Sequence, residues 1–234
     1  MKKNKDSFYD NRVVFKPWGY EYTIYRNKRV AVTFVNIKYK HKTSLHSHPN
    51  KLTGFIVLNG NAMIQHGIYK ENSWIYPPVA RLVLRPGLFH SIEATSKKGV
   101  QVLEIETPVN KNDLVRFQDK YGRQHKPYEG KIFTKTIDKK NMNKNYFTFN
   151  KRSKKIQKFY VKNTIVSLER LKSFKSFKKN DQSSAAILEG DLADKKGRSV
   201  IKVGEVVRTS TLRILSDAFK LKKKFTIIRV SKSK

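Results

Sequence analysis

The stretch Ser44-Leu45-His46-Ser47-His48 places two histidines two residues apart in sequence that is typical of a β-strand. Residues i and i+2 of a strand point to the same face of a sheet, so both imidazoles are expected to enter one interior. A third histidine ends the stretch Arg85-Pro86-Gly87-Leu88-Phe89-His90, where a turn leads into another expected strand. If the two strands are neighbours, three imidazoles converge. The pattern therefore predicts a metal site of His46, His48 and His90 inside a β-barrel.

Strand signals dominate the sequence around these histidines. β-Branched and aromatic runs alternate with turn residues such as Asn59-Gly60 and Pro86-Gly87. Short strands at this spacing are typical of a sandwich or barrel, so we predict an all-β fold. The exception is the stretch 113–120, which we interpret as a short helical turn. The expected strands cover residues 30–37, 55–58, 74–76, 81–84 and 100–106.

The chain is strongly basic, with 51 Lys and Arg against 18 Asp and Glu and a formal net charge of +33. Such a charge favours a polyanionic partner. However, the lysines are scattered and no nucleic-acid-binding motif accompanies them, so we expect no specific nucleic-acid partner. The absence of cysteine excludes disulfides and thiolate metal sites. Residues 1–10 lack the apolar core of a signal peptide, and no run approaches the ~20 apolar residues of a membrane span, so we expect a cytoplasmic protein without membrane contact.

The second half resembles the first at an offset of 130 residues. Leu58-Asn59-Gly60-Asn61 aligns with Leu188-Glu189-Gly190-Asp191, and Phe89-His90 aligns with Phe219-Lys220. At this offset Ser176 and Lys178 replace the histidine pair, and no histidine follows His125. Either these matches arise by chance among common strand and turn residues, or the second half has lost every ligand. We predict a barrel over residues 1–130, a connecting segment over 131–156 and a degenerate second half over 157–234.

Three segments of the first half resemble a known family. The histidine pair, followed by Gly60 and by Gly87-x-x-His90, resembles the two cupin motifs. More specifically, Lys16-Pro17-Trp18-Gly19-Tyr20-Glu21 and the stretch 113–123, Asp-Leu-Val-Arg-Phe-Gln-Asp-Lys-Tyr-Gly-Arg, are similar to the cupin domain of type II mannose-6-phosphate isomerases. The resemblance covers about half of the chain, roughly residues 12–130. It implies a cupin (RmlC-like) jelly-roll barrel, a bicupin if the second half is a degenerate copy, and a homodimer.

At two positions this chain departs from the family pattern. Cupins have a carboxylate ligand five residues after the second histidine, where this chain has Thr53, and the isomerases tend to have glutamine where His46 stands. The expected ligands are therefore three neutral imidazoles that hold one divalent transition metal, namely Zn, Fe(II), Mn or Ni. Without the carboxylate the metal keeps its full double charge, which favours an anionic substrate.

Sugar isomerisation further requires a base and a phosphate site. Glu104 and Glu106 share one face of an expected strand and are the candidate catalytic bases if that face is the interior. For a phosphorylated sugar, Arg116 and Arg123 are the candidate cationic forks because they belong to the most specific motif, and Lys42 is a further candidate. Two aromatic residues, Trp18 and Tyr121, could stack on a sugar ring.

The sequence and the resemblance favour a metal-dependent cupin that acts on a phosphorylated or nucleotide-linked sugar, as an isomerase or epimerase in surface-glycan metabolism. The substrate class comes from the resemblance. Two alternatives stay open: a three-histidine non-haem iron oxygenase, and a non-catalytic sugar-binding or assembly module. Thr53 and the second half without ligands favour the latter.

Overall fold

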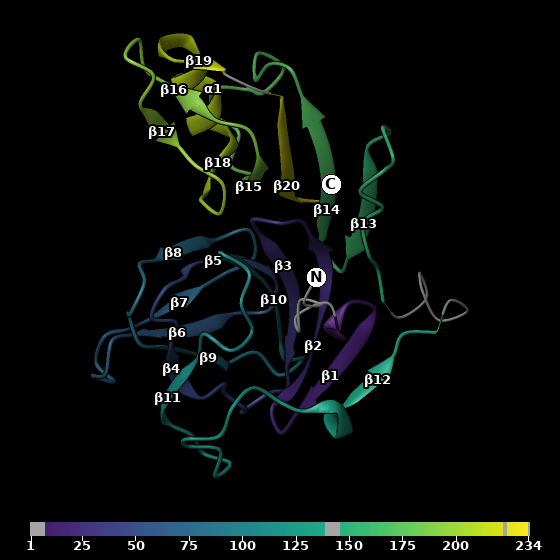
Figure 1. Ribbon diagram of the computed structural model, residues 1–234, viewed down its shortest axis with the longest axis vertical. Coiled ribbons are helices and arrows are strands. Elements are labelled where there is room, and N and C mark those ends of the chain that lie inside the picture. Colours follow the sequence, from purple (N-terminus) through teal and green to yellow (C-terminus); the bar gives the residue numbers. More distant parts are fainter. Residues whose placement is uncertain (1–7, 139–145, 222–223, 234) are drawn as a thin grey trace, which may run out of the picture.

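Two antiparallel sheets form a barrel in the first half of the molecule. In the computed structural model, which describes residues 8–138, 146–221 and 224–233, a seven-stranded sheet (sheet A) has the order β12-β1-β2-β3-β10-β5-β8, and a five-stranded sheet (sheet B) has the order β11-β4-β9-β6-β7 (Figure 1). The predicted all-β fold is confirmed. The strands are β1 (Arg12–Lys16), β2 (Gly19–Arg26), β3 (Ala31–Ile37), β4 (Leu45–Ser47), β5 (Leu52–Asn59), β6 (Ala62–His66), β7 (Ser73–Tyr76), β8 (Arg81–Leu84), β9 (His90–Ala94), β10 (Val100–Thr107), β11 (Val115–Gln118) and β12 (Thr134–Thr136), with a short 3-10 helix at Lys131–Phe133.

Alternation along β10 decides which side chains enter the barrel. Val102 packs between the sheets in a core of mainly aliphatic side chains, whereas Leu103 and Ile105 belong to a second core on the outer face of sheet A. Because the side-chain period of a strand is two, Glu104 and Glu106 share the inward direction of Val102. Both glutamates therefore point into the barrel.

The stretch 113–120 is not the helical turn that we predicted. It contains strand β11, which pairs with β4 so that Arg116 lies opposite His46. A strand wins here because β4 offers an unpaired edge whose N–H and C=O groups need partners. The motif with the strongest family resemblance thus lies beside the histidine pair.

The segment 131–156 does more than connect the halves. Strand β12 pairs with β1 at the edge of sheet A. Farther along, Phe147 and Phe149 are buried in the outer core. The lysine- and asparagine-rich stretch 139–145 and the N-terminal residues 1–7 lie outside the described residues.

The second half repeats the strand order of the first. Its five-stranded sheet has the order β13-β14-β20-β15-β18. When the strands of each half are compared in chain order, this arrangement is the same as that of β2-β3-β10-β5-β8 in sheet A. At the 130-residue offset, β5 and β15 both end one residue before a glycine with positive φ, Gly60 or Gly190. Strands β16, β17 and β19 form a small second sheet. The elements are β13 (Gln157–Val161), β14 (Thr164–Leu171), β15 (Ser184–Glu189), β16 (Leu192–Ala193), β17 (Ser199–Ile201), β18 (Val206–Arg208), α1 (Thr209–Ala218), β19 (Lys220–Leu221) and β20 (Phe225–Lys232).

The interior of the second half is apolar where the first half carries histidines. The described segment between β14 and β15 contains no strand equivalent to β4. It supplies Phe174 and Phe177, and the ring of Phe174 packs against those of Phe177 and Phe225. Helix α1 adds the buried Leu212 to the same cluster. Aromatic and aliphatic side chains therefore fill the core of this half.

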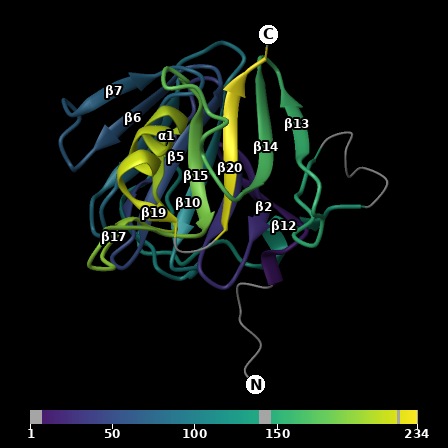
Figure 2. The same cartoon turned by 90° about the horizontal axis from the view of Figure 1, so that it is seen from above.

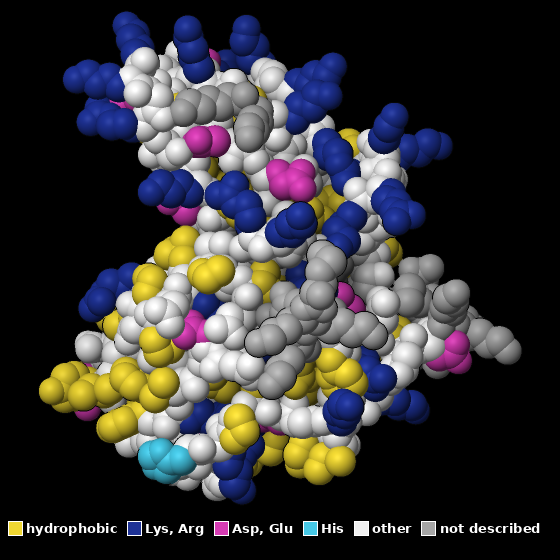
Figure 3. Space-filling view, in the orientation of Figure 1, with side chains coloured by type: hydrophobic (Ala, Val, Ile, Leu, Met, Phe, Trp, Pro, Cys, Tyr) yellow, Lys and Arg dark blue, Asp and Glu magenta, His cyan; other side chains and the backbone are white. Residues whose placement is uncertain are grey.

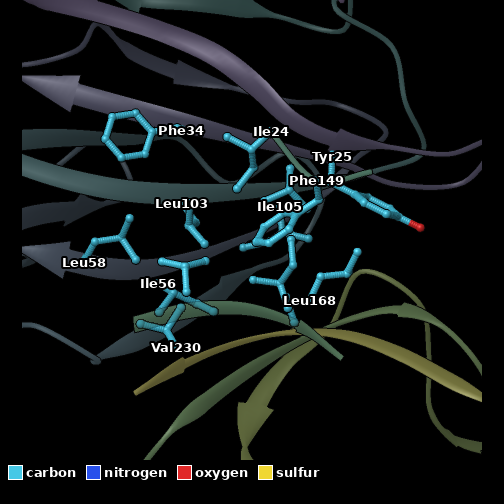
Figure 4. Close-up of a cluster of buried hydrophobic side chains, with 14 of the residues drawn as sticks. Ile24, Tyr25, Phe34, Ile56, Leu58, Leu103, Ile105, Phe149, Leu168 and Val230 are labelled. Carbon is cyan, nitrogen blue, oxygen red and sulfur yellow. The ribbon is translucent and has the colours of Figure 1, made fainter. Parts of the chain in front are cut away.

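The two halves share one hydrophobic core. The sheet of the second half covers the outer face of sheet A, and Figure 4 shows side chains such as Ile56 and Leu103 of the first half facing Leu168 and Val230 of the second. Seen from above, β13, β14, β20 and β15 lie across the strands of the first half (Figure 2). Among the described residues, none of the helices has the length and apolar composition for a membrane crossing.

Candidate metal centre

Three histidines meet inside the barrel. His46 on β4 pairs with His90 on β9, and His48 follows the end of β4. The ring centroids lie 4.4 Å apart for His46 and His90, 5.1 Å for His46 and His48, and 5.5 Å for His48 and His90. The structure thus brings together the three residues that the sequence singled out as ligands.

Each of these imidazoles is held by a backbone carbonyl behind it. The Nδ1 atom donates to the carbonyl oxygen of Ser44 in His46 (2.8 Å), of Asp113 in His48 (2.5 Å) and of Leu88 in His90 (3.0 Å). A carbonyl oxygen only accepts, so Nδ1 carries the proton and the lone pair lies on Nε2. Such second contacts are typical of metal-binding histidines, because they set the tautomer and the ring direction.

Burial keeps the rings of His46 and His90 neutral. It lowers the pKa of His90 to about 4, with the neighbouring His48 as the next cause. Burial and the two other imidazoles also hold the pKa of His46 well below its ordinary value. At neutral pH the rings of His46 and His90 are therefore uncharged and their Nε2 lone pairs are available.

Glu104 is a fourth donor, which the sequence assigned as a candidate base rather than as a ligand. One ligand atom of each of His46, His48, His90 and Glu104 can be chosen so that all four lie within 4.8 Å of one another. Thr53, at the usual cupin carboxylate position, lies on β5 directly opposite Glu106 of β10. The carboxylate at this centre is therefore supplied by Glu104 on β10, the neighbour of β5, where the usual cupin carboxylate would lie.

Glu106, the other candidate base, is fixed by two buried ammonium groups. It accepts hydrogen bonds from Lys51, which is 1% exposed, and from Lys111 at 3.4 Å. Burial acts to raise the pKa of Glu106, but Lys51 and Lys111 hold it well below the usual range. In the same contacts Glu106 and Glu21 raise the pKa of Lys111 despite its burial. The group is therefore an ionised carboxylate between two cations at neutral pH.

The predicted phosphate forks are engaged with carboxylates and carbonyls. Arg116 donates to the carbonyl oxygens of Lys126 and Pro127 and to Glu129, and Arg123 donates to Asp119 at 2.6 Å and to Glu129 at 2.8 Å. Both arginines nevertheless line the pocket in front of the histidines. Glu129, which is not in the lining, contacts both guanidinium groups and holds them in place.

The remaining predicted residues separate into two groups. Trp18 is buried and lines the pocket. Lys42 and Tyr121 are not among the described residues that line it; Lys42 makes a β-bridge to Glu93, and the ring of Tyr121 stacks on His41 with centroids 6.3 Å apart. The structure thus brings Trp18 to the site and leaves Lys42 and Tyr121 outside the pocket.

Sequence reasoning missed several charged residues of the pocket. Lys16 pairs with Glu129 and lies 3.5 Å from Glu21, which accepts a hydrogen bond from Tyr128. The sequence did offer a signal for Lys16 and Glu21, because both belong to the segment 16–21 that resembles the family. Lys51 and Lys111 had no signal, because an isolated lysine in a lysine-rich chain reads as a surface charge.

The cluster has the properties of a metal site. Within the described residues, the Nε2 atoms of His48 and His90 are buried and have no hydrogen-bond partner. A buried polar atom without a partner costs free energy unless something occupies the space before it. Three imidazole nitrogens and one carboxylate suit Zn, Fe, Mn or Ni, so the residues present fit such an ion.

Relatives of known name share the first half of the chain. The mannose-1-phosphate guanylyltransferase of Salmonella montevideo is 28% identical over 127 residues, 52% of this chain and 26% of that protein. The xanthan biosynthesis protein XanB of Xanthomonas campestris pv. campestris is 28% identical over 119 residues, 48% of this chain and 24% of that protein. The matched segment thus spans about a quarter of the length of these relatives.

Solved structures are similar over about half of the chain. A Klebsiella pneumoniae protein with a double-stranded β-helix domain has a TM-score of 0.40 at 12% identity and covers 51% of this chain and 99% of its own. CapF has a TM-score of 0.41 at 16% identity, covering 46% and 34%. The family model of the mannose-6-phosphate isomerase C-terminal domain matches residues 3–119, half of the chain. With the barrel described above, the chain belongs to this family and its first half has a cupin fold.

Proposed function

We propose that the protein is a metal-dependent cupin that acts on a phosphorylated or nucleotide-linked sugar, as an isomerase or epimerase in surface-glycan metabolism. The observation that carries the proposal is the set of four donors, His46, His48, His90 and Glu104, in the lining of a pocket. The relatives named for mannose 1-phosphate and xanthan support the substrate class. The cytoplasm, where such sugar precursors are made, is the location we propose.

The charges around the pocket favour an anionic substrate. Its lining contains more basic side chains than carboxylates, and His46 and His90 add no charge. Because Asp119 and Glu129 behind the lining already pair with the arginines, a bound divalent ion would supply the positive charge that attracts a phosphate. The basic lining residues are Lys16, Lys51, Lys111, Arg116 and Arg123, and the acidic ones are Glu21, Glu104 and Glu106.

The roles of the residues follow from their contacts. A divalent ion held by the histidines and Glu104 would polarise the carbonyl and hydroxyl oxygens of a sugar. Glu106 is a weak base because two ammonium groups stabilise its ionised form. We therefore assign Glu106 to the positioning of Lys51 and Lys111 rather than to proton transfer.

A non-catalytic sugar-binding module is the second candidate function. The cavity at the centre holds only about 60 Å³, whereas pockets that enclose whole small molecules are several times larger. Only the reacting end of a sugar would fit unless a lining residue moves. The three-histidine oxygenase has less support, because Glu104 adds a carboxylate to the donor set.

Elemental analysis of the purified protein tests the proposal. We expect about one equivalent of a transition metal in the wild type and a loss of most of it in the His46→Ala/His48→Ala variant. The matched control is His66→Ala/His125→Ala, which removes two histidines outside the cluster. Isomerase assays with mannose 6-phosphate and other aldose phosphates then separate the two functions: tight binding without turnover supports the module, and absence of metal in all three proteins overturns the metal-dependent function.

Two further proposals concern architecture. The equal strand orders support a degenerate second cupin in residues 157–234. A homodimer is supported by strand β7 at the edge of sheet B, which exposes Trp74 (53%) and Ile75 (61%), because a free edge with apolar side chains can pair with a second copy. Light scattering of the wild type and of Trp74→Glu/Ile75→Glu tests the dimer. We expect a dimer that the substitutions convert to a monomer, and a monomeric wild type contradicts the proposal.

A further inference from the structure

Three cationic side chains in the wall of the histidine pocket share one carboxylate. Lys16, Arg116 and Arg123 all line the pocket. The carboxylate of Glu129 accepts hydrogen bonds from Arg123 at 2.8 Å and from Arg116 at 3.3 and 3.5 Å, and Lys16 forms an ion pair with the same group. Glu129 is 7% exposed and does not itself belong to the lining. Because all three partners line the pocket, the carboxylate fills an anion site that adjoins it.

Glu129 belongs to a loop that polar contacts hold to the barrel. Residues 124–130 lie between β11 and the 3-10 helix and form no strand. In Figure 1 this part of the chain runs along the lower end of the barrel. Residues 124–127 and Gly130 are exposed, and only Tyr128 and Glu129 are at least partly buried. Tyr128 belongs to none of the apolar cores that the described residues form. Moving the loop therefore opens no apolar core and breaks no strand pairing.

The contacts of the loop are of a kind that a charged ligand can replace. The ring of Tyr128 lies over the ammonium group of Lys16, with 4.0 Å between the Nζ atom and the ring centroid, and its hydroxyl donates to Glu21. The carbonyl oxygen of Pro127 accepts a hydrogen bond from Arg116 at 2.8 Å. Exchanging one set of hydrogen bonds for another has a small net cost in free energy. The loop can therefore give up these contacts when a ligand supplies equivalent ones.

The volume of the pocket requires such a movement. The cavity in front of the histidines measures about 60 Å³, whereas sites that enclose a small molecule have ~300 Å³ or more. A sugar phosphate therefore does not fit while Tyr128 and Glu129 are in place. Other lining residues, such as His46, His90 and Glu104, lie on paired strands and cannot withdraw without breaking the sheets. The loop 124–130 is thus the part of the wall that can make room.

A phosphate group suits the anion site better than a carboxylate does. At neutral pH a phosphate monoester carries almost two negative charges and has three strong acceptor oxygens, whereas a carboxylate has one charge and two oxygens. Arginine forks bind phosphate through paired hydrogen bonds. The formal net charge of +33, and the lysine and arginine side chains spread over the surface in Figure 3, also attract anions over longer distances.

We propose that Glu129 is an internal substitute for the phosphate group of the substrate. The phosphate displaces its carboxylate from the three cations, and the loop 124–130 moves away to admit the sugar. The inference rests on the proposed function and assigns the substrate's phosphate to Lys16, Arg116 and Arg123. Opening of the loop is thereby coupled to recognition of the phosphate, so an unphosphorylated sugar leaves the pocket closed.

Isothermal titration with mannose 6-phosphate tests the sign of the effect. We expect Glu129→Ala to bind this probe about tenfold more tightly than the wild type, because no internal anion has to leave first. Glu129→Gln, which keeps the size of the side chain, should also bind more tightly. The control Glu71→Ala removes an exposed carboxylate from the hairpin between β6 and β7 and should leave the affinity unchanged. Weaker or unchanged binding by both Glu129 variants, as for a carboxylate that only positions the arginines, or an equal gain in the control, would overturn the proposal.

Two further variants and two probes locate the gain. Arg123→Gln combined with Glu129→Gln should cancel it, and a gain that persists in this double variant would contradict the assignment. The gain should also appear with inorganic phosphate but not with mannose; a gain with inorganic phosphate alone would show an anion site closed to sugars and refute the proposal. In the His46→Ala/His48→Ala background the gain should persist, so absence of metal from the wild type would overturn the proposed function and leave this result standing. A gain that requires the histidines would place the phosphate at the metal centre and exclude the role of Glu129.

Discussion

His46 and His90 lie directly opposite each other on antiparallel strands, with their ring centroids 4.4 Å apart. Arg116 lies opposite His46 on the other side of β4. Cross-strand neighbours have fixed spacing, so the sheet itself holds the two imidazoles in place. A third strand, β10, supplies Glu104 to the same cluster. Three of the four donors therefore lie on strands and His48 directly follows one, which favours a fixed geometry.

Glu104→Gln is expected to lower metal affinity by about 10- to 100-fold, as for other residues that tune metal sites. The substitution keeps the size of the side chain and removes the negative charge that balances the ion. Titration of metal-free protein with Zn²⁺ and a competing chelator measures the change. Glu71→Gln is the control because it removes an exposed carboxylate from the hairpin between β6 and β7. Equal affinities of wild type and Glu104→Gln would remove Glu104 from the ligand set.

Lys51→Met is expected to lower the free energy of unfolding by about 3 kcal/mol, because it leaves Glu106 buried with only Lys111 as a cationic partner. Urea titration measures the loss. The control Lys97→Met removes an exposed lysine and should change stability by less than about 0.5 kcal/mol. A loss for Lys51→Met no larger than for the control would show that the buried pair contributes nothing to stability.

Gly204→Ala tests the packing of the two halves. A Cβ atom at Gly204 would lie 2.1 Å from Cγ2 of Thr107, and its φ is +95°. Steric overlap and the positive φ together should cost about 3 kcal/mol. Gly67→Ala is a matched control, because Gly67 has a φ of +86° with nothing within 4 Å of the added Cβ; it should cost about 1 kcal/mol. Thermal unfolding compares the two, and similar shifts in both would exclude a close contact at Gly204.

The ion-pair cluster around Glu129 is expected to make stability depend on acid pH. Burial acts to raise the pKa of Glu129, but Lys16 and Arg116 hold it below its ordinary value of 4.5. A carboxyl whose folded pKa is lowered adds stability that is complete above the unfolded value and is lost as pH falls through the folded value. Unfolding free energies measured from pH 6 to 3 should therefore fall less steeply for Glu129→Gln than for wild type. Parallel curves would contradict this assignment.

Local sequence correctly predicted several strands of the first half. Alternating and β-branched runs gave β3, β5, β7, β8 and β10 because their apolar faces are visible in one strand alone. The prediction of a helical turn over 113–120 was wrong, because strand β11 in this stretch depends on its partner β4, about seventy residues earlier, and not on its own residue pattern. Helix α1 was also missed, since it interrupts a half that otherwise follows the strand order of the first.

The sequence by itself determined which side chains share a face: His46 with His48, and Glu104 with Glu106. The reason is local, because the two-residue period of a strand follows from backbone geometry. Only the tertiary structure decided that both faces point into the same barrel, that Glu104 joins the histidines while Thr53 faces Glu106, and that Lys51 is buried. These outcomes depend on the register between strands far apart in the chain, which long-range packing selects and no local pattern encodes.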